Sequence, residues 1–168
     1  STGMAYVRPR PMGYEAKNIT VEDCVFVGSQ SPIAFVGVDG ALVQNNTIYR
    51  PQRWVFRILQ ETRAEGFVPC RNGVFRRNIV VYHRDEISRI VNVGSGVDSQ
   101  SFQFQENFWY CGDQPDHVQH VRRELPTPER GGQFGADPQF VNPDRGDFKL
   151  SDGSPASGVG PRLQRARR

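Results

Sequence analysis

The chain has 168 residues, of which 37% are hydrophobic and 23% charged, and it contains 17 glycines and 12 prolines. This composition predicts one soluble, turn-rich domain, and no apolar run approaches the roughly 18 residues of a membrane span. The net charge of +3 belongs to residues 161–168, which hold four arginines and no acid. We expect 161–168 to be a basic disordered tail. Because aromatic residues do not alternate with these arginines, nucleic acid is not an expected partner, and the lack of a long apolar run argues against a membrane.

A six-residue motif recurs four times along the chain. Each copy has an apolar residue, two polar residues, then Asn (Cys in the first copy), then two residues that favour strands. The fourth positions are Cys24, Asn46, Asn78 and Asn107, at steps of 22, 32 and 29 residues. A period in this range with variable insertions indicates stacked repeats. We interpret the copies as coils of a parallel β-helix, in which Asn46, Asn78 and Asn107 form an internal ladder whose amides bond one another and the turn backbone, a position that suits a residue tolerating the left-handed conformation.

A second strip of residues has the same periodicity. Val36, Ile58 and Ile90 each follow the fourth position of their motif by twelve residues. This fixed offset predicts a second strand in each coil, with the variation in length falling after it. No amphipathic run of helical period is present, so the pattern favours strands over a helical solenoid.

The chain divides into segments around these coils. Residues 1–17 are expected to be a loop or the remnant of a preceding coil, and the coils occupy 18–112. Residues 113–136, rich in Pro, Gly and charge, are expected to form a long loop. Residues 137–160 are expected to cap the last coil, because an uncovered sheet end exposes strand edges and core.

The capping segment has a distinctive wording: Asp137-Pro138-x-Phe140, then Gly146-Asp147-Phe148-x-Leu150, then Gly153-Ser154-Pro155-Ala156. With the Asn-punctuated coils, it resembles the C-terminal portion of right-handed parallel β-helix proteins of the pectate-lyase-like superfamily. The resemblance covers most of residues 18–158. It implies an extracellular or periplasmic bacterial protein that binds or processes polysaccharide or oligosaccharide through lyase, hydrolase or epimerase chemistry. It also allows a non-enzymatic structural or adhesion module.

Arg57 and Arg89 are the leading candidates for chemistry. Both precede an aligned isoleucine, so we expect them to form one outward column with Phe35. Two guanidinium groups one strand apart repel unless an anion lies between them, and Arg binds the carboxylate of a uronic acid in bidentate fashion. Either arginine could be the neutraliser or the base of a lyase. The alternative is pairing with local acids such as Glu61 or Glu86.

Other candidates rest on weaker signals. Glu61 and His83 are further catalytic candidates, and Glu61 with Glu86 could flank a glycosidic bond. The alternative for His83 is a solvated turn. The expected substrate-binding residues, which could instead anchor the core or a loop, are Trp54, Tyr82, Glu86 and Trp109.

Cysteines and acids imply no cofactor. Cys24 occupies the Asn position of the repeat, so we expect a buried thiol, whereas a Cys70–Cys111 disulfide is left open. No Cys or His cluster supports a metal site, and the acids fall on different coils, so no calcium site can be assigned. An open first coil would expose apolar side chains, so we expect either self-association through it or its coverage by residues 1–17.

Overall fold

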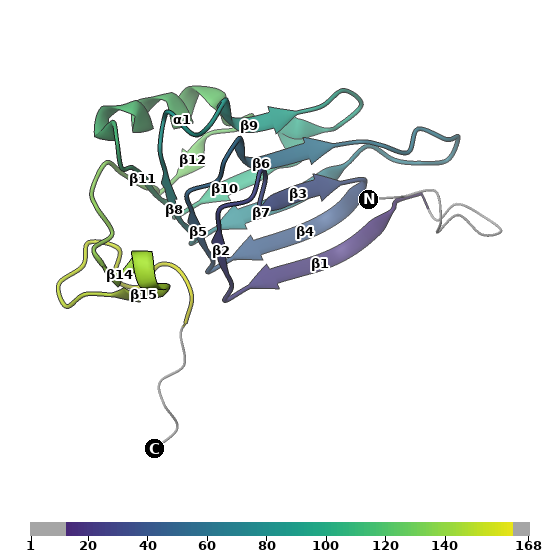
Figure 1. The fold of residues 1–168 in the computed structure, drawn as a ribbon. Coiled ribbons are helices and arrows are strands. Elements are labelled where there is room, and N and C mark those ends of the chain that lie inside the picture. The colour runs from purple at the N-terminus through teal and green to yellow at the C-terminus, as the bar shows by residue number, and fades with distance from the viewer. Residues whose placement is uncertain (1–12, 163–168) are drawn as a thin grey trace, which may run out of the picture.

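The computed structural model describes residues 13–162, and most of its strands lie in three parallel sheets (Figure 1). The first sheet has the order β1 (Ala16–Glu22), β4 (Val38–Gln44), β7 (Arg71–Arg76), β10 (Gln103–Gln105) and β12 (Glu129–Arg130). The second has the order β2 (Val25–Val27), β5 (Thr47–Tyr49), β8 (Ile79–Tyr82), β11 (Phe108–Cys111) and β13 (Gln133–Phe134). The third contains β3 (Ile33–Val36), β6 (Trp54–Leu59) and β9 (Arg89–Val93).

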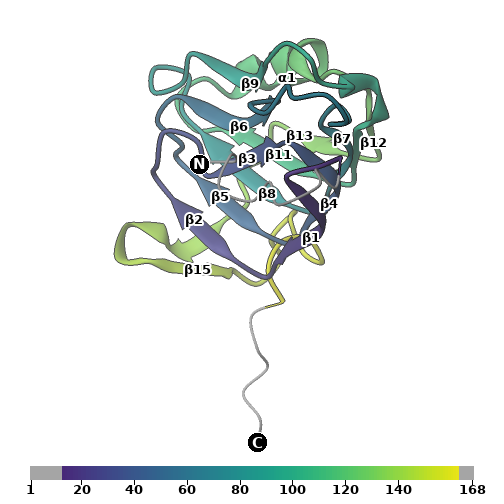
Figure 2. The same ribbon diagram turned by 90° about the vertical axis from the view of Figure 1, so that its right-hand side faces the viewer.

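The chain visits the three sheets in turn and then returns to the first. We call each circuit a pass, so that β1, β2 and β3 make the first pass and β4, β5 and β6 the second. In the fourth pass, helix α1 (Val118–Glu124) follows β11 and contacts β9. Figures 1 and 2 show the passes stacked, with β1 at the lower end and α1 at the upper end. Short 3₁₀ helices are η2 (Ser99–Ser101), η3 (Pro115–His117) and η4 (Pro143–Arg145).

The core lies between the sheets and is built from one side of each strand. Val43 pairs in register with Phe75, and Phe75 with Phe104, and all three side chains are buried. Phe56 of the third sheet stacks on Phe75 with ring centroids 5.2 Å apart. Side chains alternate between the two faces of a strand, so the intervening positions of the first sheet face outward, and they include apolar Leu42 and Val74 beside polar Gln44 and Arg76.

The asparagines at the fourth motif positions form a single hydrogen-bonded file. Oδ1 of Asn78 accepts from the backbone N and from Nδ2 of Asn46, both at 3.0 Å. Oδ1 of Asn107 accepts in the same way from Asn78, at 3.0 and 3.1 Å. At one end the backbone N of Cys24 donates to Asn46 Oδ1, and at the other Asn107 Nδ2 donates to Glu129 Oε2. The file therefore joins all the passes through buried polar groups that have their hydrogen-bond partners.

The left-handed residue of each corner is the residue before the fourth motif position. These residues are Asp23, Asn45, Arg77 and Glu106, with φ between 52° and 54°. The fourth position must point its side chain inward to join the file, so the change of chain direction falls one residue earlier. This corner separates β1 from β2, and each of the first three passes gives three strands instead of the two expected for each coil.

The prediction that Val36, Ile58 and Ile90 occupy equivalent positions is wrong for the third sheet. Ile58 pairs with Phe35 and with Val93, not with Val36 and Ile90. The cause is the connection between the second and third sheets, which spans residues 83–88 in the third pass but 50–53 in the second. This longer turn is held by Asp113, whose carboxylate accepts from the backbone N of Arg84 at 2.7 Å.

The C-terminal third also differs from expectation. Residues 113–136 are not a long loop, because they contain η3, α1, β12 and β13. Residues 137–160 do not cover the last pass. Instead, the antiparallel hairpin of β14 (Phe140–Asn142) and β15 (Asp147–Leu150) packs on the outer side of the second sheet. That sheet is apolar on both faces, since every residue of β8 is buried, so it requires a cover outside as well as a core inside.

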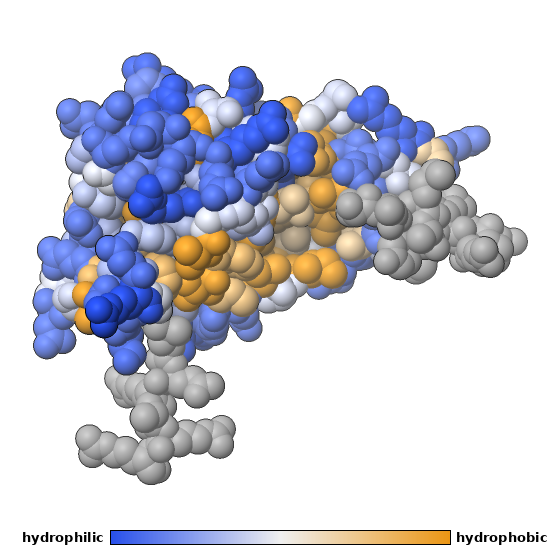
Figure 3. All heavy atoms as spheres, viewed as in Figure 1, coloured by the Kyte–Doolittle hydropathy of each residue, from blue (hydrophilic) through white to orange (hydrophobic). Residues whose placement is uncertain are grey.

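The two ends of the stack differ. At the upper end, β12 and β13 have two residues each, and α1 lies beside β9. At the lower end, β1, β2 and β3 each pair with a strand on one side only among the described residues. Ile19 on β1 is 45% exposed. Figure 3 shows apolar side chains gathered on the face that carries these strands.

All three cysteines are free, so Cys70 and Cys111 form no disulfide. Cys24 is half-buried and not the buried thiol expected, because it lies at the open end of the file. No helix between residues 13 and 162 has the length and hydropathy to cross a bilayer. Residues 1–12 and 163–168, which hold most of the expected leading loop and basic tail, lie outside the described part.

Candidate functional site

A cationic and aromatic cluster lies on the outer side of the third sheet. Trp54 begins β6, and the guanidinium carbons of Arg53 and Arg57 lie 4.3 and 4.5 Å from the centroid of its ring. Cation–π attraction of this kind fixes an otherwise mobile arginine. We call Arg53, Trp54, Arg57 and Arg89 the Trp54 patch.

The sheet register positions the members of the patch. Arg57 pairs with Ala34 on one side and with Asn92 on the other. Arg89, the first residue of β9, pairs with Trp54. Next to it, the backbone N of Ser88 donates to the carbonyl of Arg53 at 2.9 Å, which holds the start of β9 against the patch.

The positive charge of the patch is uncompensated. None of its three arginines forms an ion pair with another residue of the described range. Nε of Arg57 is buried and has no hydrogen-bond partner there. Other arginines do bind carboxylates: Arg50 binds Glu86, Arg71 binds Asp39, Arg77 binds Glu106, and Arg162 binds Asp23. The patch can therefore receive an anion.

The expected column of Phe35, Arg57 and Arg89 is not present. The longer third-pass turn shifts β9, so Arg89 lies beside Trp54 and Phe35 pairs with Ile58 in the core. Only Arg57 contacts the Trp54 ring, and Arg89 is placed beside Trp54 by the strand register alone. The sequence analysis did not select Arg53. Its position next to Trp54, which is followed three residues later by Arg57, could have indicated a cation–π cluster.

The prediction of a substrate-binding role is wrong for several residues. Tyr82 and Trp109 are fully buried, so neither can contact a substrate. The Tyr82 hydroxyl lies 3.0 Å from Nδ1 of His117, and Trp109 Nε1 donates to Glu129 at 3.1 Å. Glu86 is engaged by Arg50. The ring of Trp54 is covered by guanidinium groups and supports the arginines instead of stacking on a sugar.

The two remaining catalytic candidates lie on other segments. His83 is in the turn after β8 and packs against Gly112, where an added Cβ would lie 2.7 Å from Nε2. Glu61 is exposed in the segment after β6. Within residues 13–162, no three His, Cys, Asp or Glu side chains are arranged to hold a metal ion.

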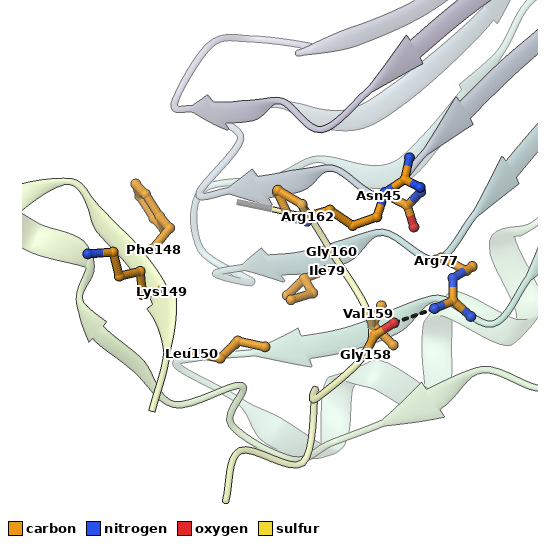
Figure 4. A pocket seen from close by; sticks show the side chains of 11 residues that line it. Asn45, Arg77, Ile79, Phe148, Lys149, Leu150, Gly158, Val159, Gly160 and Arg162 are labelled. Atoms are coloured by element: carbon orange, nitrogen blue, oxygen red, sulfur yellow. Dashed lines mark hydrogen bonds between the residues drawn. The ribbon is translucent and has the colours of Figure 1, made fainter. Parts of the chain in front are cut away.

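A separate hollow of about 420 Å³ lies between the C-terminal segment and the second sheet (Figure 4). We call residues 158–162 the C-terminal strap. The guanidinium of Arg77 donates to the Gly158 carbonyl, and the backbone N of Gly160 donates to the Arg77 carbonyl at 2.9 Å. Arg162 then reaches Asp23 of the first pass. These polar groups bind one another, so we assign the hollow to packing of the strap.

No protein-family model, curated protein or solved structure matches the chain.

Proposed function

We propose that the chain is a right-handed parallel β-helix that binds acidic polysaccharide or oligosaccharide through the Trp54 patch. The β-helix assignment is supported by three parallel sheets visited in a fixed order, by equivalent corners and by the asparagine file. Right-handedness is supported by the near-universal hand of parallel crossover connections. The resemblance of the C-terminal segment to pectate-lyase-like proteins agrees with this proposal.

The binding proposal rests on one observation: the guanidinium groups of Arg53 and Arg57 both lie against the Trp54 ring, and neither forms an ion pair with a carboxylate of the described residues. A buried donor without a partner costs about 1–3 kcal/mol, and the like charges add repulsion. A planar carboxylate would offset the repulsion, since guanidinium binds it in bidentate fashion. A uronic acid supplies this group on an extended polymer that can lie along the outer side of a sheet.

Binding is better supported than catalysis. A lyase needs a base in addition to a group that neutralises the carboxylate. Arginines can neutralise the substrate, but no carboxylate or imidazole of the described residues hydrogen-bonds within the patch. We therefore propose a carbohydrate-binding module, with lyase activity as a further property to be measured.

The test is titration of polygalacturonate, alginate and neutral dextran into the whole protein by calorimetry. We expect acidic polymers to bind and dextran not to bind. The Arg57→Ala variant should weaken binding at least tenfold, and Arg57→Lys should also weaken it because the bidentate contact is lost. Arg145→Ala, at an exposed position of η4, is the matched control.

Two results would contradict the proposal. One is failure of every acidic polymer to bind the folded wild-type protein. The other is equal affinity of the Arg57→Ala and Arg145→Ala variants, because the patch would then have no part in binding. Appearance of an unsaturated sugar product, followed by ultraviolet absorbance, would show lyase chemistry in addition.

A further inference from the structure

The lower end of the stack is an apolar hollow bordered by unpaired strands. It has a volume of about 520 Å³, and its lining includes Ile19, Val21, Phe26, Ile33 and Phe35. The edge of β1 beside it is seven residues long, whereas the upper edges of the first and second sheets have two residues each and the upper edge of the third, β9, contacts α1. Long flat edges next to apolar surface are avoided in isolated proteins, because they pair with other chains.

The asparagine file ends at this hollow. Within the file, each side-chain oxygen accepts from the backbone N of the pass below it. Cys24 occupies the lowest position and has no side-chain oxygen to accept from a further pass. Its thiol instead donates to the carbonyl of Glu22 at 3.1 Å. The file therefore does not favour another asparagine-bearing pass as the cover, and a different partner is needed.

From Ile19 to Glu22, after the left-handed Asn18, strand β1 is complementary to itself in the antiparallel direction. Ile19 and Val21 pair with buried Ala41 and Val43, so they share the inner face, whereas Thr20 shares the outer face with Leu42. Directly opposed residues of an antiparallel pair lie on the same face. Pairing centred on Thr20 therefore places Ile19 opposite Val21 of the second copy and Thr20 opposite Thr20.

The charges of β1 are compatible with the same arrangement. Lys17 stands near one end of the strand and Glu22 at the other, with Asp23 directly after it. Antiparallel pairing brings Lys17 of each copy to the end that carries Glu22 and Asp23 of the other, where Arg162 of the same chain already pairs with both carboxylates. A two-fold axis through Thr20 also sets β2 of one copy below β3 of the other, so that the two apolar hollows face each other.

We infer that the lower end is the interface of a two-fold, head-to-head dimer in which β1 pairs with β1 of a second copy. Such an interface is isologous and closes, so it produces dimers and not fibres. It extends the first sheet through both copies and covers both hollows. It is independent of the Trp54 patch, which lies on the outer side of the third sheet.

The test is the mass in solution of the whole protein by sedimentation equilibrium. Wild type should have twice the chain mass of 19.0 kDa. Thr20→Lys places two lysines directly opposite each other at the dyad, and Thr20→Glu places two glutamates there, so each variant alone should be a monomer. An equimolar mixture of the two should return to a dimer, because opposite charges then face each other. Val141→Lys, at another exposed apolar position, should remain dimeric.

A wild-type monomer at 100 μM would overturn the inference. A dimer that persists unchanged in both Thr20 variants would overturn it too, because the contact would then lie elsewhere. Two monomeric variants that fail to form a dimer when mixed would show that Thr20 does not lie on the two-fold axis. Circular dichroism of each variant checks that it is folded, and polygalacturonate binding should be unchanged.

Discussion

The side chain of Glu129 fills the space in front of Gly132, where an added Cβ would lie 2.5 Å from Glu129 Cγ and 2.9 Å from Cδ. Gly132 precedes Gln133, the partner of Phe108, and therefore stands where Asn107 stands one pass earlier. The carboxylate of Glu129 thus takes the place of the next amide in the file. It accepts from the backbone N and Nδ2 of Asn107 and from Trp109 Nε1.

We expect Glu129→Ala to lower the free energy of unfolding by about 3 kcal/mol, because it leaves buried donors of Asn107 and Trp109 without an acceptor. Urea denaturation followed by tryptophan fluorescence measures this loss. Glu106→Ala is the control, since its exposed pair with Arg77 should contribute no more than about 1 kcal/mol. Equal losses for the two variants would mean that Glu129 does not complete the file.

The interior of the file should be far more sensitive than its open end. Asn78→Ala removes the acceptor of two Asn46 donors and the donor to the Val43 carbonyl, so we expect a loss of about 3 kcal/mol or more. Cys24→Ala, at the same motif position of the first pass, should cost less than about 1 kcal/mol. Thermal unfolding compares the two variants, and a similar loss at both positions would argue against the file as a stabilising element.

The thiols should differ in reactivity because the thiolate is the reacting form. Cys70 and Cys111 are buried, and burial raises the pKa of Cys70 and raises that of Cys111 to about 11. Cys24 is half-buried at the edge of the stack. Titration of the native protein with a disulfide reagent should therefore modify one thiol quickly and the other two only after unfolding. Rapid modification of more than one thiol would contradict this assignment. A rapidly reacting thiol that remained in Cys24→Ser would contradict it too.

Stability should depend on pH through Asp39. Hydrogen bonds from Arg71 and then Asn72 lower the pKa of this buried carboxyl below its ordinary value. A lowered folded pKa stabilises the protein above the unfolded value of about 3.9, and the contribution is lost as the pH falls through the folded pKa. The stability advantage of wild type over Asp39→Asn should therefore shrink below about pH 4. Urea unfolding at pH 7, 5, 4 and 3 measures it, and a constant difference would show no linkage.

The sequence predicted the asparagine file, because identical side chains at one motif position mark equivalent places in a stack. It did not predict the corners, since two of the four left-handed residues are Arg77 and Glu106, which carry no turn signal. The register of Arg89 depended on a turn whose length leaves no trace in the hydrophobic pattern. Tyr82 and Trp109 were misjudged because aromatic residues suit a core as well as a sugar site.

The C-terminal strap makes the two ends of the described chain depend on each other. It bonds to Arg77 of the third pass and ends with Arg162 on Asp23 of the first. The lower pass therefore cannot unravel by itself without first peeling this strap away. A single proteolytic cut between the hairpin and the strap, near residue 155, should therefore destabilise β1, which lies more than a hundred residues earlier in the chain.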